Sequence, residues 1–293
     1  MTAMNSIFLD PEFSDEQRRE LLYGGQLIQY SASPGALKLC NLAQEMLEEV
    51  FSPHDPREAQ YHYSVEQYAA ILGDLKPKFI HHPRAKDAIQ QLLVERGCDP
   101  DKTYFDVPRL RTSTAQGYLT TGIAFAFHPH RDTWYSAPMC QLNWWMPVYP
   151  IEQDNGMAFH PYYWDNPVKN SSAGYNYQNW VKNSRFIASQ QVKTDTREQP
   201  KPQEEMQLDP QVRVIAPPGS ITLFSAAQMH SSIPNSTHLT RISIDFRTVH
   251  IDDVRERRGA PNIDSHCTGT TMGDYLRASD LGRIPDDLIA MYL

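Results

Sequence analysis

The stretch from residue 211 to 250 decides the expected fold and reads QVRVIAPPGSITLFSAAQMHSSIPNSTHLTRISIDFRTVH. Three of its segments are rich in branched and aromatic residues, as β-strands are: Gln211–Ala216, Ile221–Phe224 and Arg241–His250. The residues Pro217-Pro218-Gly219-Ser220 between the first two are a strong turn signal. Short strands joined by tight turns are typical of an antiparallel sheet, so this region predicts a β-rich core.

The same strand-like composition, rich in branched and aromatic residues, begins near Thr103. Residues 165–210 interrupt it, because they are polar and broken by prolines, and they predict an insertion with one short helix near 178–188. The further strands expected upstream of the insertion are Tyr104–Arg111, Leu119–Phe127 and Gln141–Val148.

The first hundred residues have helical periodicity instead. Ser14 and Ser64 are candidate N-caps, and further helices are expected at 34–51 and 83–96, with another from about Pro285. Helices that flank a set of strands predict a mainly β fold with flanking α-helices, for which a jelly roll is a suitable core. We expect one domain over 1–293, with helical support in 1–102, a core in 103–250 and a tail in 251–293.

Composition narrows the class of protein. The chain has 293 residues and a net charge of −8, which argues against nucleic acid as the main partner. The segment MTAMNSIFLDPEFSDEQ has no export-leader pattern, and no apolar run approaches the roughly 18 residues of a membrane span. The four cysteines form no C-x-x-C pair. These features predict a cytoplasmic protein with a small-molecule partner and no membrane, and they leave its oligomeric state open.

The segment FHPHRDTWYSAP, residues 127–138, is the densest cluster of reactive side chains. His130 and Asp132 are two residues apart, so on an extended chain both point to one face and can reach one metal ion. His230 follows a predicted strand and can supply a third ligand. Two histidines and one carboxylate form the facial triad of non-haem Fe(II) oxygenases, which leaves positions for a co-substrate and O₂. An H-x-D pair alone is common, so the context has to support this reading.

Arg241 provides that context. It stands eleven residues after His230, at the start of the apolar strand RISIDF. A guanidinium near the metal is suited to a carboxylate, which it can bind through two parallel hydrogen bonds. The alternative is an exposed charge at a strand edge, and Arg247 on the same face of the strand is the competing anchor.

Taken together, these motifs resemble the phytanoyl-CoA dioxygenase-like family. The matching residues are His130-Arg131-Asp132, Gln153-Asp154-Asn155-Gly156, Pro218-Gly219-Ser220, His230 with Pro234-Asn235-Ser236-Thr237, and Arg241. The resemblance, which covers about residues 109 to 249, implies a double-stranded β-helix, Fe(II), 2-oxoglutarate and O₂. It also implies a hydroxylase that releases succinate and CO₂. In that reading His130, Asp132 and His230 are the catalytic metal ligands, Arg241 anchors 2-oxoglutarate, and Ser232 and Trp134 lie beside it.

Other residues are candidates for the pocket. Gln141, Asn143 and Trp145 alternate with apolar neighbours, so they are expected to share one face of their strand and to contact substrate. Arg109 and Arg111 share a strand face before the metal cluster, where Arg109 is expected to bind substrate and Arg111 the co-substrate. Ion pairs on the sheet surface are the alternative for both arginines.

Two competing functions remain open. A cupin-type metalloenzyme would use His128, His130 and His230, although the segment RDTWYSAP lacks the glutamate that a cupin motif needs. A non-catalytic binding protein on the same fold is the second alternative. The complete set of His130, Asp132, His230 and Arg241 favours an oxygenase over the non-catalytic binding protein.

Overall fold

The structure is a computed structural model that describes residues 6–293. The first five residues, part of the segment in which no export leader was expected, lie outside the described range. Within that range, no helix is both long and apolar enough to cross a membrane.

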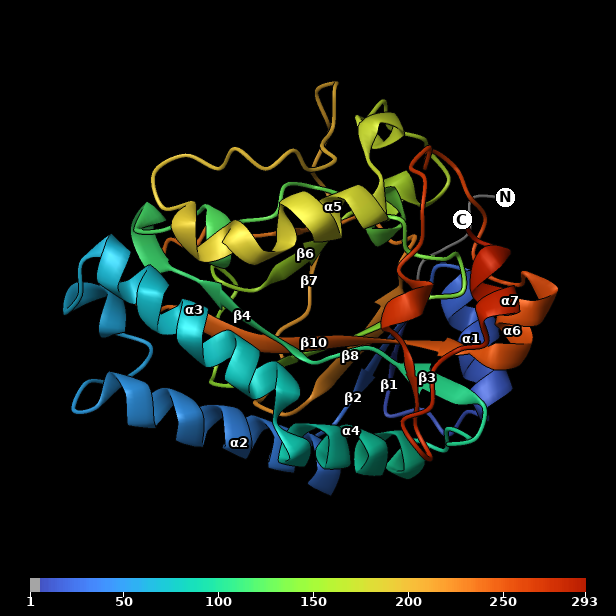
Figure 1. Ribbon diagram of the computed structural model, residues 1–293, viewed down its shortest axis with the longest axis horizontal. Helices are drawn as coiled ribbons and strands as arrows, with labels where there is room; N and C mark the ends of the chain where they lie inside the picture. Colours follow the sequence, from blue (N-terminus) through green and yellow to red (C-terminus); the bar gives the residue numbers. More distant parts are fainter. Residues whose placement is uncertain (1–5) are drawn as a thin grey trace.

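The fold is a mixed β-structure with helices packed around it (Figure 1). The main sheet has the order β1-β2-β8-β5-β10-β3-β11, and β4 pairs with β10 beside β3. Its strands are β1 Ile7–Leu9, β2 Leu27–Tyr30, β3 Thr103–Phe105, β4 Arg109–Ser113, β5 Leu142–Pro147, β8 Ile221–Ser225, β10 Arg241–His250 and β11 Leu276–Arg277.

A second, smaller sheet has the order β7-β6-β9. Its strands are β6 Met157–Phe159, β7 Val212–Arg213 and β9 His230–Ser232. An isolated antiparallel bridge from His130 to His230 adds the segment before Asp132 to its edge. This pairing joins two parts of the chain that lie a hundred residues apart.

The helices of the N-terminal third support one face of the main sheet. In Figure 1, α2 and α4 lie on one side of β8 and β10, whereas β6 and α5 lie on the other. The expected caps are present, since the hydroxyls of Ser14 and Ser64 both accept a hydrogen bond from the third backbone N–H of their helix. The helices are α1 Asp15–Tyr23, α2 Pro34–Phe51, α3 Val65–His81, α4 Pro83–Glu95, α5 Tyr177–Asn183, α6 Ile251–Glu256 and α7 Asp286–Ala290.

Two sequence expectations about strands need correction, and several short strands were missed. Leu119–Phe127 is not a strand: it holds a 3-10 turn at 122–124, where Gly122 has a φ of +58°. Pro108 lies between β3 and β4, so the single strand expected at 104–111 is two. The short strands β1, β2, β6, β9 and β11 were not predicted, because two to four residues are too few to show a period.

Alternation along the central strands gives the main sheet two different faces. The side chains of Ile242, Ile244 and Phe246 on β10 belong to the apolar core shared with the helices, as do Leu142, Trp144 and Met146 on β5. Their neighbours in the sequence point the opposite way, toward the second sheet. The polar face of the main sheet therefore forms a wall of the space between the two sheets.

Candidate active site

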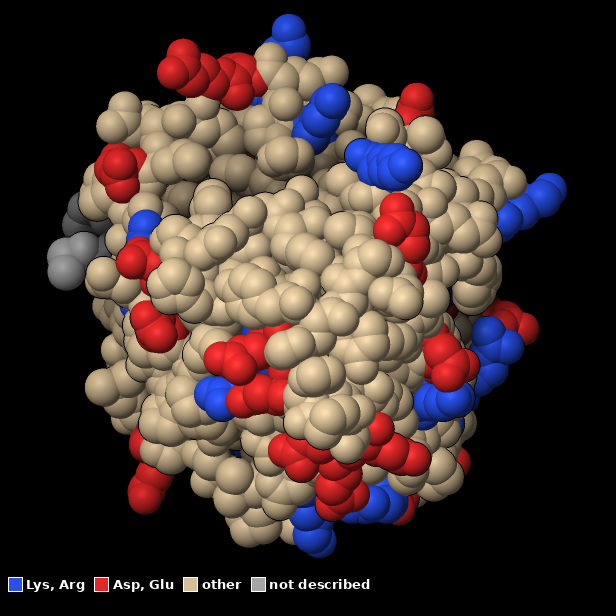
Figure 2. Space-filling model, turned by 90° about the vertical axis from the view of Figure 1, so that its left-hand side faces the viewer, with Lys and Arg blue, Asp and Glu red and all other residues tan. Residues whose placement is uncertain are grey.

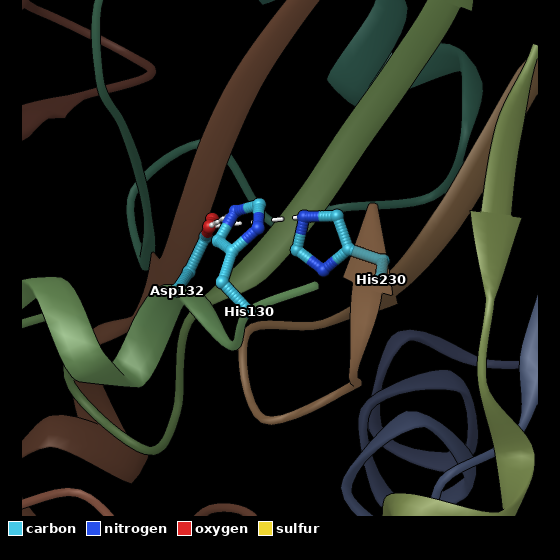
Figure 3. Close-up of side chains that lie close together, drawn as sticks. All are labelled: His130, Asp132 and His230. Carbon is cyan, nitrogen blue, oxygen red and sulfur yellow. Dashed lines mark ion pairs between the residues drawn. The ribbon is translucent and has the colours of Figure 1, made fainter. Parts of the chain in front are cut away.

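The three predicted metal ligands come together between the sheets. One donor atom from each of His130, Asp132 and His230 lies within 4.8 Å of the others. Figure 3 shows the three side chains pointing toward one another, two from the segment 130–132 and the third from β9. Paired backbone hydrogen bonds between His130 and His230, of 2.9 and 3.0 Å, fix the distance between the two segments.

Hydrogen bonds to the backbone orient both imidazole rings in the same way. Nδ1 of His130 lies 2.7 Å from the carbonyl of His128, and Nδ1 of His230 lies 2.9 Å from the carbonyl of Gln228. An Nδ1–H that donates to a carbonyl leaves the Nε2 lone pair free, which is the arrangement of a metal-binding histidine. Both Nε2 atoms lie near Oδ1 of Asp132, at 3.4 and 3.9 Å.

The carboxylate of Asp132 is held for binding through one oxygen. Its Oδ2 accepts hydrogen bonds from Nδ2 of Asn143 at 2.9 Å and Nε2 of Gln141 at 3.2 Å, so Oδ1 remains for the histidines and a metal. Burial by itself raises the pKa of Asp132, but the hydrogen bond with His130 and the charge of Arg247 hold it well below its usual value. Burial and the neighbouring His130 lower the pKa of His230 to about 4. The carboxylate is therefore ionised and His230 neutral at pH 7, as metal ligands require.

A buried ion pair supports the loop that carries these ligands. Asp264 accepts hydrogen bonds from Nε of Arg131 at 3.1 Å and from Nε1 of Trp134 at 2.7 Å. Trp134 is 0% exposed and packs against Tyr163 and Met229. It is not among the described residues that line the cavity, so the cavity gives no support to the expected position of Trp134 beside a co-substrate.

A cavity of about 670 Å³ opens from the metal ligands. Its walls are the polar face of the main sheet, the second sheet, α3 and the insertion 165–210. It contains all the other predicted site residues, namely Arg109, Arg111, Gln141, Asn143, Trp145, Ser232 and Arg241. Gln141 and Asn143 each donate an amide hydrogen bond to Asp132, which orients its carboxylate.

Arg241 and Arg247 differ in what neutralises them. Arg247 pairs with Asp106 at 3.1 Å and lies 3.8 Å from both Asp132 and Asp245. Arg241 is 7% exposed, and within the described residues it has no carboxylate partner and its Nε has no hydrogen bond. Burial lowers the pKa of Arg241 to about 10.

The remaining contacts of Arg241 are neutral. Nη1 lies 3.4 Å from the carbonyl of Gly156, and the guanidinium carbon lies 5.7 Å from the centre of the Trp145 ring. A buried cation without an anion is costly, so the position is suited to a ligand carboxylate. Arg241 is therefore the better anchor of the two arginines.

Sequence reasoning missed Ser243. Its hydroxyl is fully buried, has no hydrogen-bond partner in the described part of the chain, and lines the cavity two residues after Arg241 on β10. The available signal was this two-residue spacing, which places both side chains on one face of the strand. A ligand carboxylate bound at Arg241 would give this hydroxyl an acceptor.

The other predicted arginines are already paired. Arg109 bonds to Asp106, and Arg111 donates from Nε at 2.6 Å and from Nη2 at 3.3 Å to Asp245. His128, which the cupin alternative requires, has an exposed ring and stands outside the metal-ligand group. The structure therefore brings together the H-x-D set with His230, and not the H-x-H set.

Comparisons with known proteins give structural similarities only. No protein-family model and no curated protein matches the chain. Among solved structures, EvdO2 from Micromonospora carbonacea var. aurantiaca, complexed with 2-oxoglutarate, is 12% identical over 59% of this chain, with a TM-score of 0.38. The match spans 62% of EvdO2, less than two thirds of its length.

Two other solved structures cover more of both chains. ThoJ, described as a non-heme monooxygenase, is 15% identical over 87% of this chain and 81% of its own, with a TM-score of 0.39. The epimerase SnoN, in complex with Fe3+, alpha ketoglutarate and nogalamycin RO, is 15% identical over 80% of this chain and 85% of its own, with a TM-score of 0.41. Similarity at this level decides neither fold nor function, so the functional inference comes from the side chains of the cavity.

Proposed function

We propose that this chain is an Fe(II)- and 2-oxoglutarate-dependent oxygenase that hydroxylates an unactivated C–H bond of a small molecule and releases succinate and CO₂. One observation carries the proposal. A facial set of two histidines and an ionised carboxylate shares a cavity with Arg241, a buried cation that has no carboxylate partner in the described chain. The metal ligands and the arginine supply the two kinds of binding group that 2-oxoglutarate needs.

The donor set fits Fe(II). Two imidazole nitrogens and one carboxylate oxygen, oriented from one side, are the ligands that non-haem iron oxygenases use, and they leave coordination positions open. When bound, iron with 2-oxoglutarate and O₂ would supply the oxidising chemistry, which the protein has only to position and protect. The carboxylate of Asp132 occupies the position that would otherwise be free for a halide, so it favours hydroxylation over halogenation.

The residues around the metal set the position of the co-substrate. In this proposal Arg241 binds the distal carboxylate of 2-oxoglutarate, with further hydrogen bonds from the hydroxyls of Ser243 and Ser232. Gln141 and Asn143 keep Asp132 in place. The facing sheets support a double-stranded β-helix, and the motif order supports membership of the phytanoyl-CoA dioxygenase-like family.

Calorimetry under anaerobic conditions tests the proposal. We expect 2-oxoglutarate to bind the protein tightly with Fe(II) present and weakly without it, and we expect Asp132→Ala to abolish the metal-dependent part. On admission of O₂, the wild-type protein should convert 2-oxoglutarate to succinate. A screen of small molecules should find a substrate that increases the rate of succinate formation. Binding of 2-oxoglutarate that is the same with and without Fe(II) would overturn the proposal.

A further inference from the structure

The cavity has more cationic side chains than carboxylates, and the proposed co-substrate does not neutralise all of this difference. Seven cationic side chains line it, against three carboxylates, although the whole chain has a net charge of −8. The face shown in Figure 2 does not share this excess, because acidic side chains gather in its lower part and basic ones are scattered. The cationic residues of the cavity are Lys76, Arg109, Arg111, Arg185, Arg197, Arg241 and Arg247.

Most of these charges have partners. Asp274 pairs with Arg185 and Asp195 with Arg197, just outside the lining. Arg241 and Asp132 are assigned to 2-oxoglutarate and the metal. The four remaining cations, Lys76, Arg109, Arg111 and Arg247, face only two carboxylates, Asp106 and Asp245. One positive charge, and a second when Lys76 is protonated, is therefore left over for a substrate.

Lys76 is the cation whose charge is least compensated. Its Nζ, on α3, donates to the carbonyl of Ile123 at 2.6 Å and to Oγ1 of Thr112 at 3.3 Å, both neutral acceptors. No carboxylate of the described chain lies within ion-pair distance of it. Burial and the charge of Arg111 lower the pKa of Lys76 to about 7, against an opposing effect of Asp245. An anion placed beside a buried amine stabilises its protonated form.

Arg111 lies next to Lys76, because β4 packs against α3. Its bonds to Asp245 use Nε and Nη2, and Nη1 has no hydrogen-bond partner among the described residues. The guanidinium carbon lies 5.4 Å from the centre of the Phe127 ring. Ile123 and Phe125 also line this part of the cavity. Two cations therefore stand at the edge of an apolar and aromatic surface.

We propose that the substrate carries a carboxylate or phosphate group on an apolar body, and that this anion binds between Lys76 and Arg111. The proposal rests on the proposed function, since it assigns Arg241 to 2-oxoglutarate and this second cationic site to the substrate. The anion completes the compensation of Lys76, and the apolar body lies against Phe125 and Phe127. Lys76 is then a specificity-determining residue, and it touches neither the metal ligands nor the co-substrate.

Calorimetry with matched probes tests this assignment. The protein is loaded with Fe(II) and saturated with 2-oxoglutarate without O₂, so that Arg241 is occupied. The probes are 1-naphthoate, 1-naphthyl phosphate and the neutral 1-naphthamide. We expect at least one anionic probe to bind roughly 10- to 150-fold more tightly than the amide, the range of a hydrogen bond to a charged group. The tighter of the two anions identifies the substrate group as carboxylate or phosphate.

Variants of two lysines on α3 locate the effect. Lys76→Met should remove most of the preference for the anion, and Lys76→Arg should keep part of it. Lys78→Met is the matched control, because Lys78 is exposed and pairs with Asp74, and it should leave all three affinities unchanged. Equal binding of the neutral and anionic probes, no binding by any of them, or a preference that survives Lys76→Met would each overturn the proposal.

The two proposals fail in different ways. Binding of 2-oxoglutarate is measured first in each variant, and Lys76→Met should leave it unchanged. If 2-oxoglutarate does not bind the Fe(II)-loaded wild-type protein, the proposed function fails before any probe is added. If 2-oxoglutarate binds normally and the probes show no dependence on Lys76, only the substrate assignment fails.

Discussion

Replacement of Arg241 by alanine should weaken 2-oxoglutarate binding strongly and leave iron binding intact. The guanidinium is buried against Trp145, its Nε has no partner, and its one hydrogen bond, to the carbonyl of Gly156, is long at 3.4 Å. A bound carboxylate would therefore depend on Arg241 for most of its charge compensation. Loss of one partner of a buried charged pair costs about 2–5 kcal/mol, or roughly 30- to 4,000-fold in affinity. Arg241→Lys should recover part of this, because it keeps the charge but loses the planar pair of donors.

The same variant makes a prediction about stability. Without a ligand, Arg241 is an uncompensated buried cation, so Arg241→Ala should change the unfolding free energy of the free protein little. Arg247→Ala should instead destabilise it by about 1.5–3 kcal/mol, because Asp106 would lose one of its two arginine partners and keep only Arg109. The contrast separates a ligand-binding arginine from one that stabilises the fold.

Thermal unfolding of the Fe(II) protein with and without 2-oxoglutarate measures both effects. At 100 times its dissociation constant, 2-oxoglutarate should stabilise the wild-type protein by about 2.7 kcal/mol. At the same concentration the stabilisation of Arg241→Ala should fall below about 1 kcal/mol. If Arg241→Ala keeps the wild-type affinity for 2-oxoglutarate while Arg247→Ala, still folded, loses it, then Arg247 and not Arg241 is the anchor.

Three further predictions address the metal, the insertion and the supporting ion pair. Asp132→Ala should abolish Fe(II) binding in a metal titration, whereas His128→Ala should bind iron normally, and the reverse result would favour the cupin. A Cβ at Gly122 would lie 2.3 Å from the carbonyl of residue 188 in the insertion, whereas one at Gly117, also at positive φ, would meet nothing within 4 Å. Gly122→Ala should therefore speed proteolysis within 165–210 far more than Gly117→Ala, and equal rates would show that this contact does not hold the insertion over the cavity. Asp264→Ala should lower the unfolding free energy by about 3–5 kcal/mol in urea titrations, since it leaves a buried guanidinium unpaired, and a loss under 1 kcal/mol would contradict this.

Local patterns were enough for the features that depend on near neighbours. The caps at Ser14 and Ser64 and the helix at 34–51 were predicted because capping and helical periodicity act over a few residues. The two-residue spacing of His130 and Asp132 likewise placed both side chains on one side of their segment. The identity of Arg241 as a candidate anchor also came from its position at a strand start.

Tertiary structure decided what depends on distant partners. Spacing alone left Arg241 and Arg247 equivalent, since both lie on one face of β10, and only the position of Asp106 shows that Arg247 is already neutralised. Trp134 looked like a pocket residue until Asp264, 130 residues away in the sequence, proved to hold its indole N–H. The uncompensated charge of Lys76 is likewise invisible in the sequence, because it results from the packing of α3 against β4. Sequence spacing fixes which side chains share a face, whereas burial and charge pairing depend on which segments meet when the chain folds.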